Sequence, residues 1–315
     1  MPGKITGISF TRDTTHVYAA ELATGKGNTY LLKNLTQVEI GADFQAAIAK
    51  MVQSAGLRGR KAVLTLSGHD AIVRCFEMPS IPGREVANAV RFEAQKYIPF
   101  GVKDLYFDYQ TYPNPKKRKL MVTFMAAKKD LIDGWIKVLS AAGVAVAAVE
   151  PDLMALLRLA GQRRTKKSNE MQAFISARSD RSLDVIVAKG GKPFMARYGV
   201  VASSSVQESS QFGRNFESFA KEIALSFNYY SKNFRDEEIR GIVWSADPAY
   251  ESKTWINGLR ARFDIPVEEW DISNLIGKSG LALPSTTVLI GAAMRPHQKT
   301  GGILSMLSGR KIPDL

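Results

Sequence analysis

Apolar and polar positions alternate at the start of the chain in a way that is typical of short strands. Residues 7–22, GISFTRDTTHVYAAEL, form two apolar runs joined by a polar turn, which predicts a hairpin. A further strand-like run, NTYLLKNL, follows it. Residues 43–55 change to helical spacing, and their apolar face consists of Phe44, Ile48, Met51 and Val52. The chain therefore opens with predicted strands followed by a helix.

Residues 61–147 have the pattern of a strand-rich insertion. KAVLTLSG and DAIVRCFEMP read as strands, and EVANAVRFEAQKY reads as a helix that Pro99 ends. DLYFDYQTY and LMVTFMAA are alternating runs joined by PNPKKRK, which predicts a hairpin with a basic tip. A helix, a buried strand and a second helix follow, in DLIDGWIKVLSAAG, VAVAAVEP and DLMALLRLAG. The polar and basic residues 162–170 then predict a linker between two halves.

The second half repeats the order of the first hairpin. Residues 171–200 read as a strand, a polar loop, a strand, a turn at Gly190 and Gly191, and a third strand. A long helix follows, whose apolar stripe is Phe216, Phe219, Ile223, Phe227, Tyr230 and Phe234. This stripe is typical of a helix packed on a core, because base-stacking platforms are exposed and interleaved with Lys or Arg. The strand GIVWSA, a helix around TWINGLRARF and the run STTVLIGAAMR complete an α/β domain.

We therefore predict an α/β protein of two related halves, residues 1–171 and 172–315, with an inserted subdomain at about 61–147 in the first. Two halves that each open with such a hairpin suggest an actin-like ATPase fold. The final segment, 296–315, contains a short apolar run after two glycines. We expect it to pack back on the first half, with a partner-binding tail as the alternative.

Composition supports a globular protein with a basic surface. The chain has 315 residues, is 45% hydrophobic, and carries 43 Lys and Arg against 30 Asp and Glu, a net charge of +13. Such an excess favours nucleic acid, an anionic membrane surface or an acidic protein as partner, and also fits a basic surface that only confers solubility. No helix-turn-helix, zinc-finger or RNP-type motif is evident in the sequence, so we expect no nucleic-acid partner.

Residues suited to metal or nucleophilic chemistry are few and scattered. Cys75 is the single cysteine, and His16, His69 and His297 are far apart in the sequence. We therefore expect no metal site, no disulfide within the chain and no catalytic cysteine or histidine. The N-terminus lacks the pattern of a signal peptide, and the most apolar stretch, 141–151, is too short to span a membrane. A soluble, cytoplasmic protein is expected.

One segment makes the fold expectation specific. Residues 78–113, MPSIPGREVANAVRFEAQKYIPFGVKDLYFDYQTYP, resemble the signature segment of PilM, the actin-like inner-membrane-associated assembly protein of type IV pili. The similarity rests on Met-Pro before the helix, then Glu-Ala followed by Lys-Tyr-Ile-Pro-Phe, and Asp-Tyr in the next strand. It continues through 126–159, SFNYYSKNF and IGAAMRP. The cytoplasmic part of the type II secretion protein GspL shares the fold, but this segment looks less like it.

The resemblance also implies a nucleotide site, and this chain departs from the family pattern there. In PilM-like proteins the first hairpin typically reads Gly-Ile-Asp-Ile-Gly-Ser, because glycine allows close approach to phosphate and the aspartate organises Mg²⁺. Here Ser9 stands at the aspartate position and Thr11 at the glycine position. The loop is longer through Arg12 and Asp13, and Asp13 is a candidate to replace the lost carboxylate.

The two other expected nucleotide contacts depart from the pattern as well. In the second hairpin, Ser176 and Arg178 stand where the family has an acid and a glycine. The adenosine-contacting turn, usually Ser-Gly-Gly, reads Ser245-Ala246-Asp247-Pro248, and proline stiffens it. We therefore predict a pseudo-ATPase with no cofactor. The alternative is an active, nucleotide-switched actin-like ATPase that binds Mg-ATP through divergent loops, with Arg12 or Arg178 on the phosphates.

The resemblance implies a role in assembly. PilM-like proteins bind the cytoplasmic N-terminal tail of the membrane protein PilN in a groove between the main and inserted subdomains. We expect this groove between the N-terminal strands and residues 61–147, and a protein that is peripheral at the inner membrane of a type IV pilus or related secretion system. Other pilus assembly proteins are further candidate partners. Two basic clusters are candidate contacts to an anionic leaflet or a partner, although solvated turns explain them equally well. They are Lys116, Lys117, Arg118 and Lys119 in the hairpin tip, and Arg163, Arg164, Lys166 and Lys167 in the linker.

Overall fold

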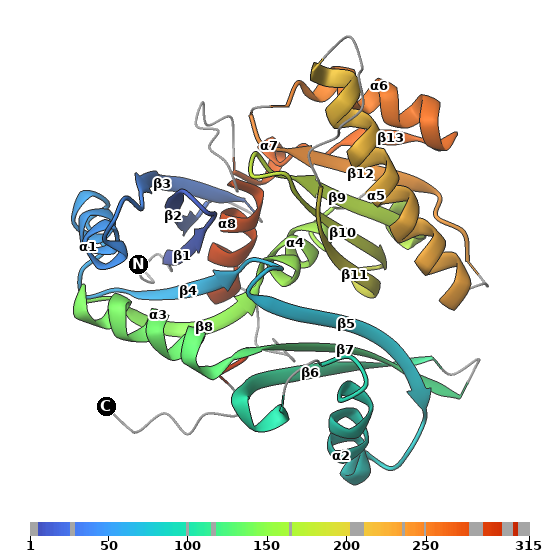
Figure 1. Cartoon of the computed structure of the whole chain (residues 1–315), viewed down its shortest axis with the longest axis horizontal. Helices are drawn as coiled ribbons and strands as arrows, with labels where there is room; N and C mark the ends of the chain where they lie inside the picture. The colour runs from blue at the N-terminus through green and yellow to red at the C-terminus, as the bar shows by residue number, and fades with distance from the viewer. Residues whose placement is uncertain are drawn as a thin grey trace.

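The structure is a computed structural model of the whole chain (Figure 1). It describes residues 6–25, 29–98, 101–114, 118–163, 166–201, 211–234, 237–248, 250–276, 286–297 and 305–307. Three sheets organise these residues, two of five strands and one of three.

The first five-stranded sheet carries the opening hairpin. Its strand order is β3-β2-β1-β4-β8, in which the first three strands are antiparallel and β4 and β8 add in parallel. The strands are β1 (Thr6–Arg12), β2 (His16–Thr24), β3 (Tyr30–Glu39), β4 (Lys61–Leu66) and β8 (Ala145–Pro151). Two amphipathic helices, α1 (Phe44–Ser54) and α3 (Lys129–Ala141), pack against the sheet and each other. Asp43 caps α1 by accepting from the N–H groups of Gln45 and Ala46.

The second sheet repeats this topology, with the order β11-β10-β9-β12-β13. Its strands are β9 (Gln172–Ala177), β10 (Ser182–Lys189), β11 (Lys192–Val200), β12 (Gly241–Ala246) and β13 (Val267–Glu269). Against it pack α5 (Gln211–Asn233) and α6 (Ser252–Phe263), and α7 (Ser273–Ile276) follows β13. The aromatic stripe of α5 is buried or partly buried in the core, as its spacing predicted. The prediction of two related halves is therefore confirmed.

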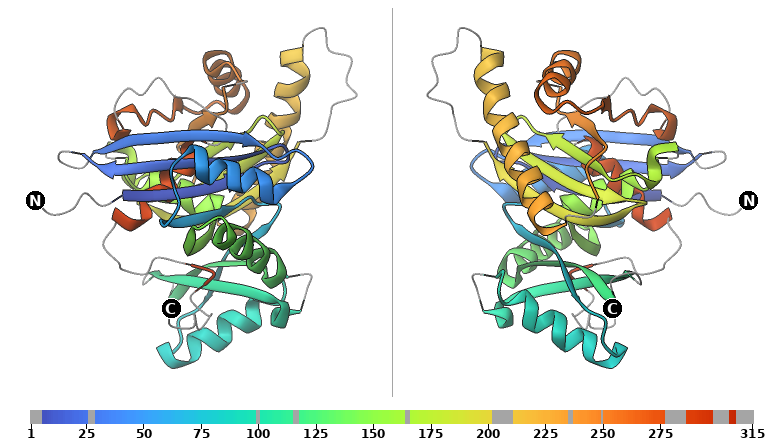
Figure 2. Two further views of the ribbon diagram at one scale, coloured as in Figure 1. Left: turned by 90° about the vertical axis from the view of Figure 1, so that its left-hand side faces the viewer. Right: turned by 90° about the vertical axis from the view of Figure 1, so that its right-hand side faces the viewer.

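The third sheet, β5-β7-β6, is the inserted one and has a small core of its own with α2. Its elements are β5 (Ala71–Pro79), α2 (Gly83–Ala94), β6 (Leu105–Asn114) and β7 (Lys119–Lys128). Figure 2 shows that it projects with α2 from one end of the molecule. The sheet is drawn from 71–128, a shorter range than 61–147, because β4 and β8 pair inside the first sheet. Short 3-10 turns lie at Val102–Asp104, Lys166–Asn169 and Arg295–His297.

Two helices connect the halves. α4 (Asp152–Ala160) directly follows β8 and contacts β10 and β11 of the second sheet. α8 (Thr286–Ala293), although it lies late in the sequence, packs against β1, β2 and β4 of the first sheet (Figure 1). The two helices touch closely, because Gly291 on α8 has no side chain to hold them apart. The boundary at 171 and 172 therefore separates the two sheets, but α8 packs with the first half.

The described part of the final segment 296–315 also returns to the first half. Residues 305–307 lie against β8, where the Met306 N–H donates to the Val149 carbonyl at 2.9 Å. No helix among the described residues has the length and apolarity that crossing a membrane would require.

Candidate functional site at the junction of the halves

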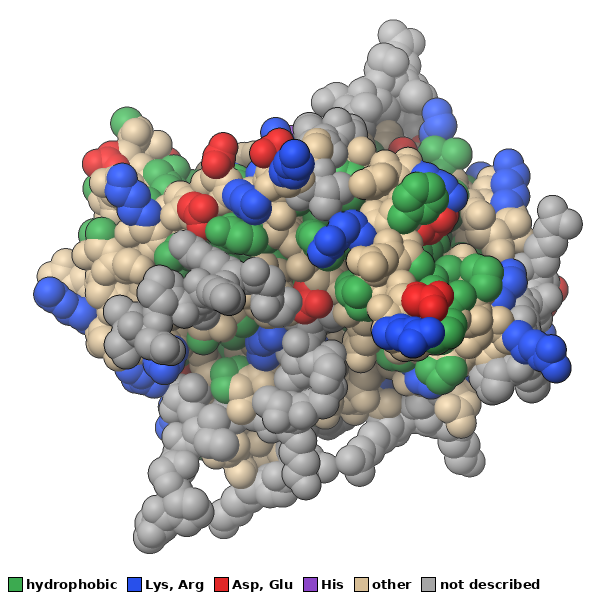
Figure 3. All heavy atoms as spheres, turned by 90° about the horizontal axis from the view of Figure 1, so that it is seen from below, with side chains coloured by type: hydrophobic (Ala, Val, Ile, Leu, Met, Phe, Trp, Pro, Cys, Tyr) green, Lys and Arg blue, Asp and Glu red, His purple; other side chains and the backbone are tan. Residues whose placement is uncertain are grey.

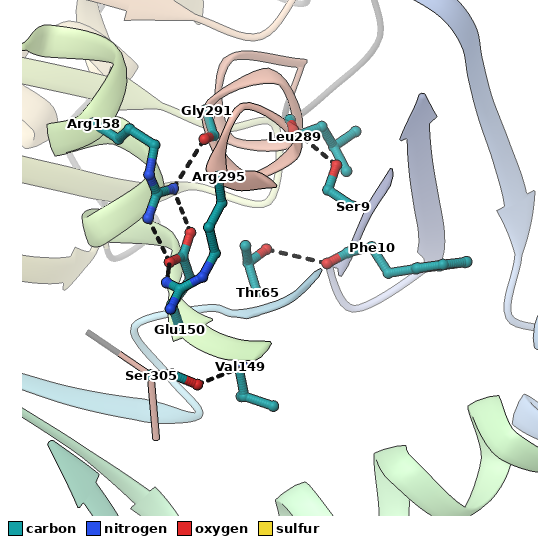
Figure 4. Close-up of polar contacts among 10 residues, drawn as sticks. All are labelled: Ser9, Phe10, Thr65, Val149, Glu150, Arg158, Leu289, Gly291, Arg295 and Ser305. Atoms are coloured by element: carbon teal, nitrogen blue, oxygen red, sulfur yellow. Dashed lines mark hydrogen bonds and ion pairs between the residues drawn. The ribbon is translucent and has the colours of Figure 1, made fainter. Parts of the chain in front are cut away.

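The first hairpin contributes two buried side chains to the junction, and both contact connecting helices. Ser9 Oγ donates to the carbonyl of Leu289 on α8 at 2.7 Å (Figure 4). Thr11 Oγ1 donates to Asp152 Oδ1, at the start of α4, at 3.3 Å. Both residues are fully buried. Two hydroxyl groups of the first hairpin therefore tie the first sheet to α8 and α4.

The lengthened loop of this hairpin is built around Asp13. Its Oδ1 accepts from the N–H groups of Thr15 and His16, both at 2.7 Å, and its Oδ2 accepts from the Tyr18 hydroxyl at 2.6 Å. Partial burial alone would raise the pKa of Asp13, but these hydrogen bonds hold it below the ordinary value. Asp13 is thus the residue that forms the turn.

Arg12, the basic residue of the same loop, is held on the outer side of the first half. Its Nη2 lies 3.1 Å from Asp70 Oδ2. Its guanidinium also lies 5.8 Å from the ring centres of Phe44 and Trp135, a cation–π distance. The residue therefore already has an acidic partner and two aromatic neighbours.

Arg178, at the end of β9, lies at the centre of the junction with only 2% of its side chain exposed. Its Nη1 donates to Asp152 Oδ2 at 2.6 Å, and its Nη2 donates to Asp184 on β10. Through Asp152 the cluster also reaches Thr11. One arginine and two fully buried aspartates therefore connect the first hairpin, α4 and the second hairpin.

The charges in this cluster do not balance. Burial by itself would lower the pKa of Arg178, but Asp184 and Asp152 hold it well above the ordinary value. Burial raises the pKa of Asp184 to about 6, although Arg178 acts in the opposite direction and Asp152 in the same one. Asp184 Oδ1 also has no hydrogen-bond partner among the described residues. The surplus negative charge is therefore concentrated at Asp184, which binds a proton more readily than an exposed aspartate.

The third predicted position joins the same junction. Asp247 Oδ2 accepts from the N–H of Ser179 at 2.9 Å and from its hydroxyl at 3.2 Å. Ser245 Oγ lies 3.5 Å from Thr287 Oγ1 on α8. Ser176, buried on β9, stands in register between Asp184 and Ser245 on the neighbouring strands. The structure thus brings the three separately predicted positions together.

Two residues at the centre of this site were missed by the sequence reasoning. Asp152 and Asp184 each interrupt an apolar run, in EPDLMALLRL and SLDVIVAK. A carboxylate inside such a run is costly to bury unless it is paired, so the interruption itself was the available signal.

A second buried ion cluster, also missed, lies beside the junction. The side chain of Glu150 on β8 is fully buried. Its carboxylate accepts hydrogen bonds from Nη1 and Nη2 of Arg158, each at 2.6 Å, and from Nη1 of Arg295 at 2.5 Å. Arg158 also donates to the carbonyl of Gly291 at 2.9 Å. Figure 4 shows the carboxylate of Glu150 facing both guanidinium groups. This cluster ties α4 and the end of α8 to the edge of the first sheet.

Two basic residues of the linker cluster form ion pairs within the protein. Arg163 and Lys167 both pair with Glu268, at 2.9 and 2.5 Å, and hydrogen bonds from them lower the pKa of this carboxylate. Arg164 lies outside the described residues, and Lys166 is described only in its backbone. The paired residues act as a clip between the linker and the second sheet.

In the hairpin tip, Arg118 is exposed with a positive φ of 51°, and exposed Lys119 pairs with Glu77 at 2.8 Å. Lys116 and Lys117 lie outside the described residues.

Two further observations concern ligand sites. Among the described residues, no group of three or more His, Cys, Asp or Glu side chains is arranged to hold a metal ion. A pocket of about 730 Å³ opens between the inserted sheet and the second half. Its lining includes the aromatic residues Tyr112, Phe194, Tyr230 and Phe234.

The two five-stranded sheets of matching topology, with a junction where their hairpins meet, define an actin-like protein. A family model described as "Type IV pilus assembly protein PilM" matches residues 31–173, slightly less than half of the chain. The resemblance to the PilM family is therefore confirmed.

Solved structures support the same fold over nearly the whole chain. A chain of the PilM-PilN type IV pilus biogenesis complex superimposes with a TM-score of 0.74 at 17% identity, covering 93% of this chain and 98% of that one. The cytoplasmic domain of EpsL, an inner-membrane component of the type II secretion system of Vibrio cholerae, gives a TM-score of 0.56 at 14% identity, covering 97% and 99%. No curated protein matches the chain by sequence.

Proposed function

We propose that this protein is a non-enzymatic scaffold in the inner-membrane assembly platform of a type IV pilus or a related secretion system. In this role it binds the cytoplasmic N-terminal tail of a PilN-like membrane protein. The observation that carries the proposal is the match of residues 31–173 to the PilM family model, together with the full-length likeness to a chain of the PilM-PilN complex. An extended tail in a groove would draw affinity from main-chain hydrogen bonds and specificity from side-chain pockets.

The absence of ATP turnover is part of the proposal, and the buried Arg178 cluster supports it. A phosphate held between two hairpins needs free donors and close backbone approach. Here Nη1 and Nη2 of Arg178 are directed at Asp152 and Asp184, and side chains stand at the expected glycine positions. The cluster itself links the two halves, which is the structural task that a bound nucleotide would otherwise perform.

The alternative, an ATPase that binds Mg-ATP with Arg12 or Arg178 on the phosphates, would require existing ion pairs to break. Arg178 would have to leave two buried carboxylates, and Arg12 would have to leave Asp70. Uncovering buried carboxylates without a counter-charge costs about 3–5 kcal/mol. Nucleotide binding would therefore begin with a penalty that an ordinary actin-like hairpin does not carry.

We place the protein in the cytoplasm at the inner membrane, held there by its PilN-like partner. The net charge of +13 favours approach to an anionic leaflet. On the face seen from below, however, the basic side chains of the described residues are spread among acidic and apolar ones (Figure 3). Membrane lipid is therefore a secondary contact in this proposal, and the protein partner provides the main attachment.

Two binding measurements test the proposal. A fluorescently labelled peptide of the cytoplasmic tail of the organism's PilN-like protein should bind, as followed by fluorescence anisotropy, whereas a scrambled peptide should not. Millimolar Mg-ATP should produce neither heat in a titration nor a rise in the melting temperature, because any ligand of the folded state raises stability. Failure of the tail peptide to bind would refute the scaffold role, and micromolar ATP binding would favour the ATPase alternative.

A further inference from the structure

β8 is an edge strand of the first sheet and contacts β5 of the inserted sheet. β8 pairs with β4 on one side and is the last strand in the sheet order. An edge strand presents backbone N–H and C=O groups that can accept another extended segment. On β8, the outward-facing groups of Val149 are those that the structure shows in use.

The occupant of this edge is the chain's own C-terminal segment. The Met306 N–H donates to the Val149 carbonyl at 2.9 Å. Figure 4 shows the second contact, in which the Val149 N–H donates to Ser305 Oγ at 3.3 Å. The Ser305 N–H donates to Asp108 Oδ2 of β6 at 2.9 Å. Residues 305–307 therefore bridge the edge of the first sheet and the inserted sheet.

The segment is seated by apolar burial as well as by hydrogen bonds. Met306 is fully buried and Leu307 is 6% exposed, and both belong to the main core. Ten residues earlier, Arg295 is anchored to Glu150, the neighbour of Val149 on β8. The ion pair of Arg295 with Glu150 thus fixes the chain next to Val149, the residue that Ser305 and Met306 contact.

We propose that residues 305–307 are an internal stand-in for the partner tail, and that a PilN-like tail must displace them to bind along β8. This inference rests on the proposed function. The single N–H of Val149 cannot donate to two extended segments at once, and the space filled by Met306 cannot hold a second apolar side chain. The partner that fits is an extended peptide with an apolar side chain at the Met306 position.

Residues 305–307, when bound to β8, should lower the apparent affinity for the partner tail. If the binding-competent state is the one in which residues 305–307 have left β8, the apparent dissociation constant rises in inverse proportion to the population of that state. Substitutions that weaken the seat of the segment should therefore tighten binding of the tail. Substitutions that fix residues 305–307 on β8 should abolish binding of the tail.

A reversible lock provides the direct test. In the double variant Asp108→Cys and Ser305→Cys, the two cysteines replace residues that are in contact through the Ser305 N–H and the Asp108 carboxylate, while the natural Cys75 is buried. The labelled PilN-like tail peptide is titrated into the full-length variant before and after oxidation, with disulfide formation followed by mass spectrometry. We expect the oxidised form to bind at least about tenfold more weakly, a difference of about 1.4 kcal/mol. Reduction should restore binding, and the single variant Ser305→Cys should show no such dependence.

A loosening variant tests the same inference without a disulfide. Met306→Asp should release the segment, because a carboxylate cannot be buried there unpaired, and should bind the tail peptide several-fold more tightly than the natural chain. A labelled synthetic copy of residues 301–311, GGILSMLSGRK, should bind the Met306→Asp protein and compete with the tail peptide. No tightening and no competition would contradict the inference even if the disulfide failed to form.

The outcomes separate the inference from the proposed function. Equal binding by the oxidised and reduced forms would overturn the inference alone and direct attention to the pocket between the inserted sheet and the second half. Failure of the PilN-like tail to bind any form of the chain would overturn the proposed function and this inference with it.

Discussion

Replacing Arg178 by methionine tests whether the buried cluster holds the two halves together. The natural cluster contains one positive and two negative side chains, all essentially inaccessible to water. Arg178→Met removes the counter-charge and leaves Asp152 and Asp184 buried without it. Removing one partner of a buried ion pair costs about 3–5 kcal/mol, so we expect a loss of that size near neutral pH. At about 2–4 °C per kcal/mol, the melting temperature should fall by about 10 °C.

The size of this loss should depend on pH in a defined direction. The folded-state pKa of Asp184 is about 6 in the natural protein, against an ordinary value of 3.8. A carboxyl group with a raised pKa takes up protons on folding, so its stabilising contribution is present below about pH 4 and is lost as the pH rises through about 6. Without Arg178, which opposes the rise in its pKa, Asp184 should bind a proton more readily still. The variant should therefore lose less stability at about pH 5 than at about pH 8.

Asp184→Asn is the matched control, since it removes the surplus negative charge and keeps an acceptor for Arg178. The raised pKa of Asp184 means that the folded protein is destabilised by roughly 1–3 kcal/mol when this carboxyl group is ionised. Asp184→Asn should therefore be as stable as the natural protein at about pH 5 and more stable at about pH 8. Urea and thermal unfolding at the two pH values measure both variants. Two results would contradict this account of the cluster. One is a loss of stability in Asp184→Asn as large as that in Arg178→Met, and the other is a loss in Arg178→Met that does not depend on pH.

Three further predictions concern packing, the second ion cluster and the single cysteine. Gly291→Ala should destabilise the protein by about 1–3 kcal/mol, because the added Cβ would lie 2.2 Å from the carbonyl oxygen of Ala155 and force α8 away from α4. Glu150→Ala should cost about 3–5 kcal/mol in urea unfolding, because two guanidinium groups lose their shared buried partner. Burial raises the pKa of Cys75 to about 12, so a thiol reagent should label it only after unfolding.

The two stability predictions each have a control in the same chain. Gly134 lies within α3 and an added Cβ there meets nothing within 4 Å, so Gly134→Ala should be neutral or stabilising by up to about 1 kcal/mol. Glu237→Ala breaks a half-exposed pair with Lys189 and should cost less than about 1 kcal/mol. Equal losses in Gly291→Ala and Gly134→Ala, or in Glu150→Ala and Glu237→Ala, would contradict the stated reasons. Rapid labelling of native Cys75 would show that its strand opens readily.

Local patterns in the sequence predicted most of the elements correctly. The first hairpin, the helix at Phe44–Ser54, the hairpin of β6 and β7 and the repeat of the opening in the second half all match the structure. These features depend on side-chain period and on turn residues, which are properties of neighbouring positions. The sequence also singled out Ser9, Thr11 and Arg178, and the structure buries all three at the junction of the halves.

Contacts between distant segments were not predictable in this way. The sequence placed Arg178 in a degenerate hairpin, but the structure pairs it with Asp152, at the start of a helix in the other half, and with Asp184. The period of apolar side chains, two residues in a strand and three to four in a helix, indicates which face of the element is buried. It does not indicate which other element covers that face. The inserted range was likewise too long, because the pairing of β4 with β8 is a non-local property.

The sequence by itself determined the elements of this protein, the repeat of its two halves and the hydroxyl and arginine side chains of the two hairpins. Only the tertiary structure decided what surrounds them: a buried arginine between two aspartates, α8 packed across the boundary on the first sheet, and residues 305–307 bound to β8. The physical reason is that a buried charge needs a counter-charge and an edge strand needs hydrogen-bond partners, and the local sequence indicates where such groups occur. Which partner it finds depends on how the sheets and helices pack, and that arrangement joins residues far apart in the chain.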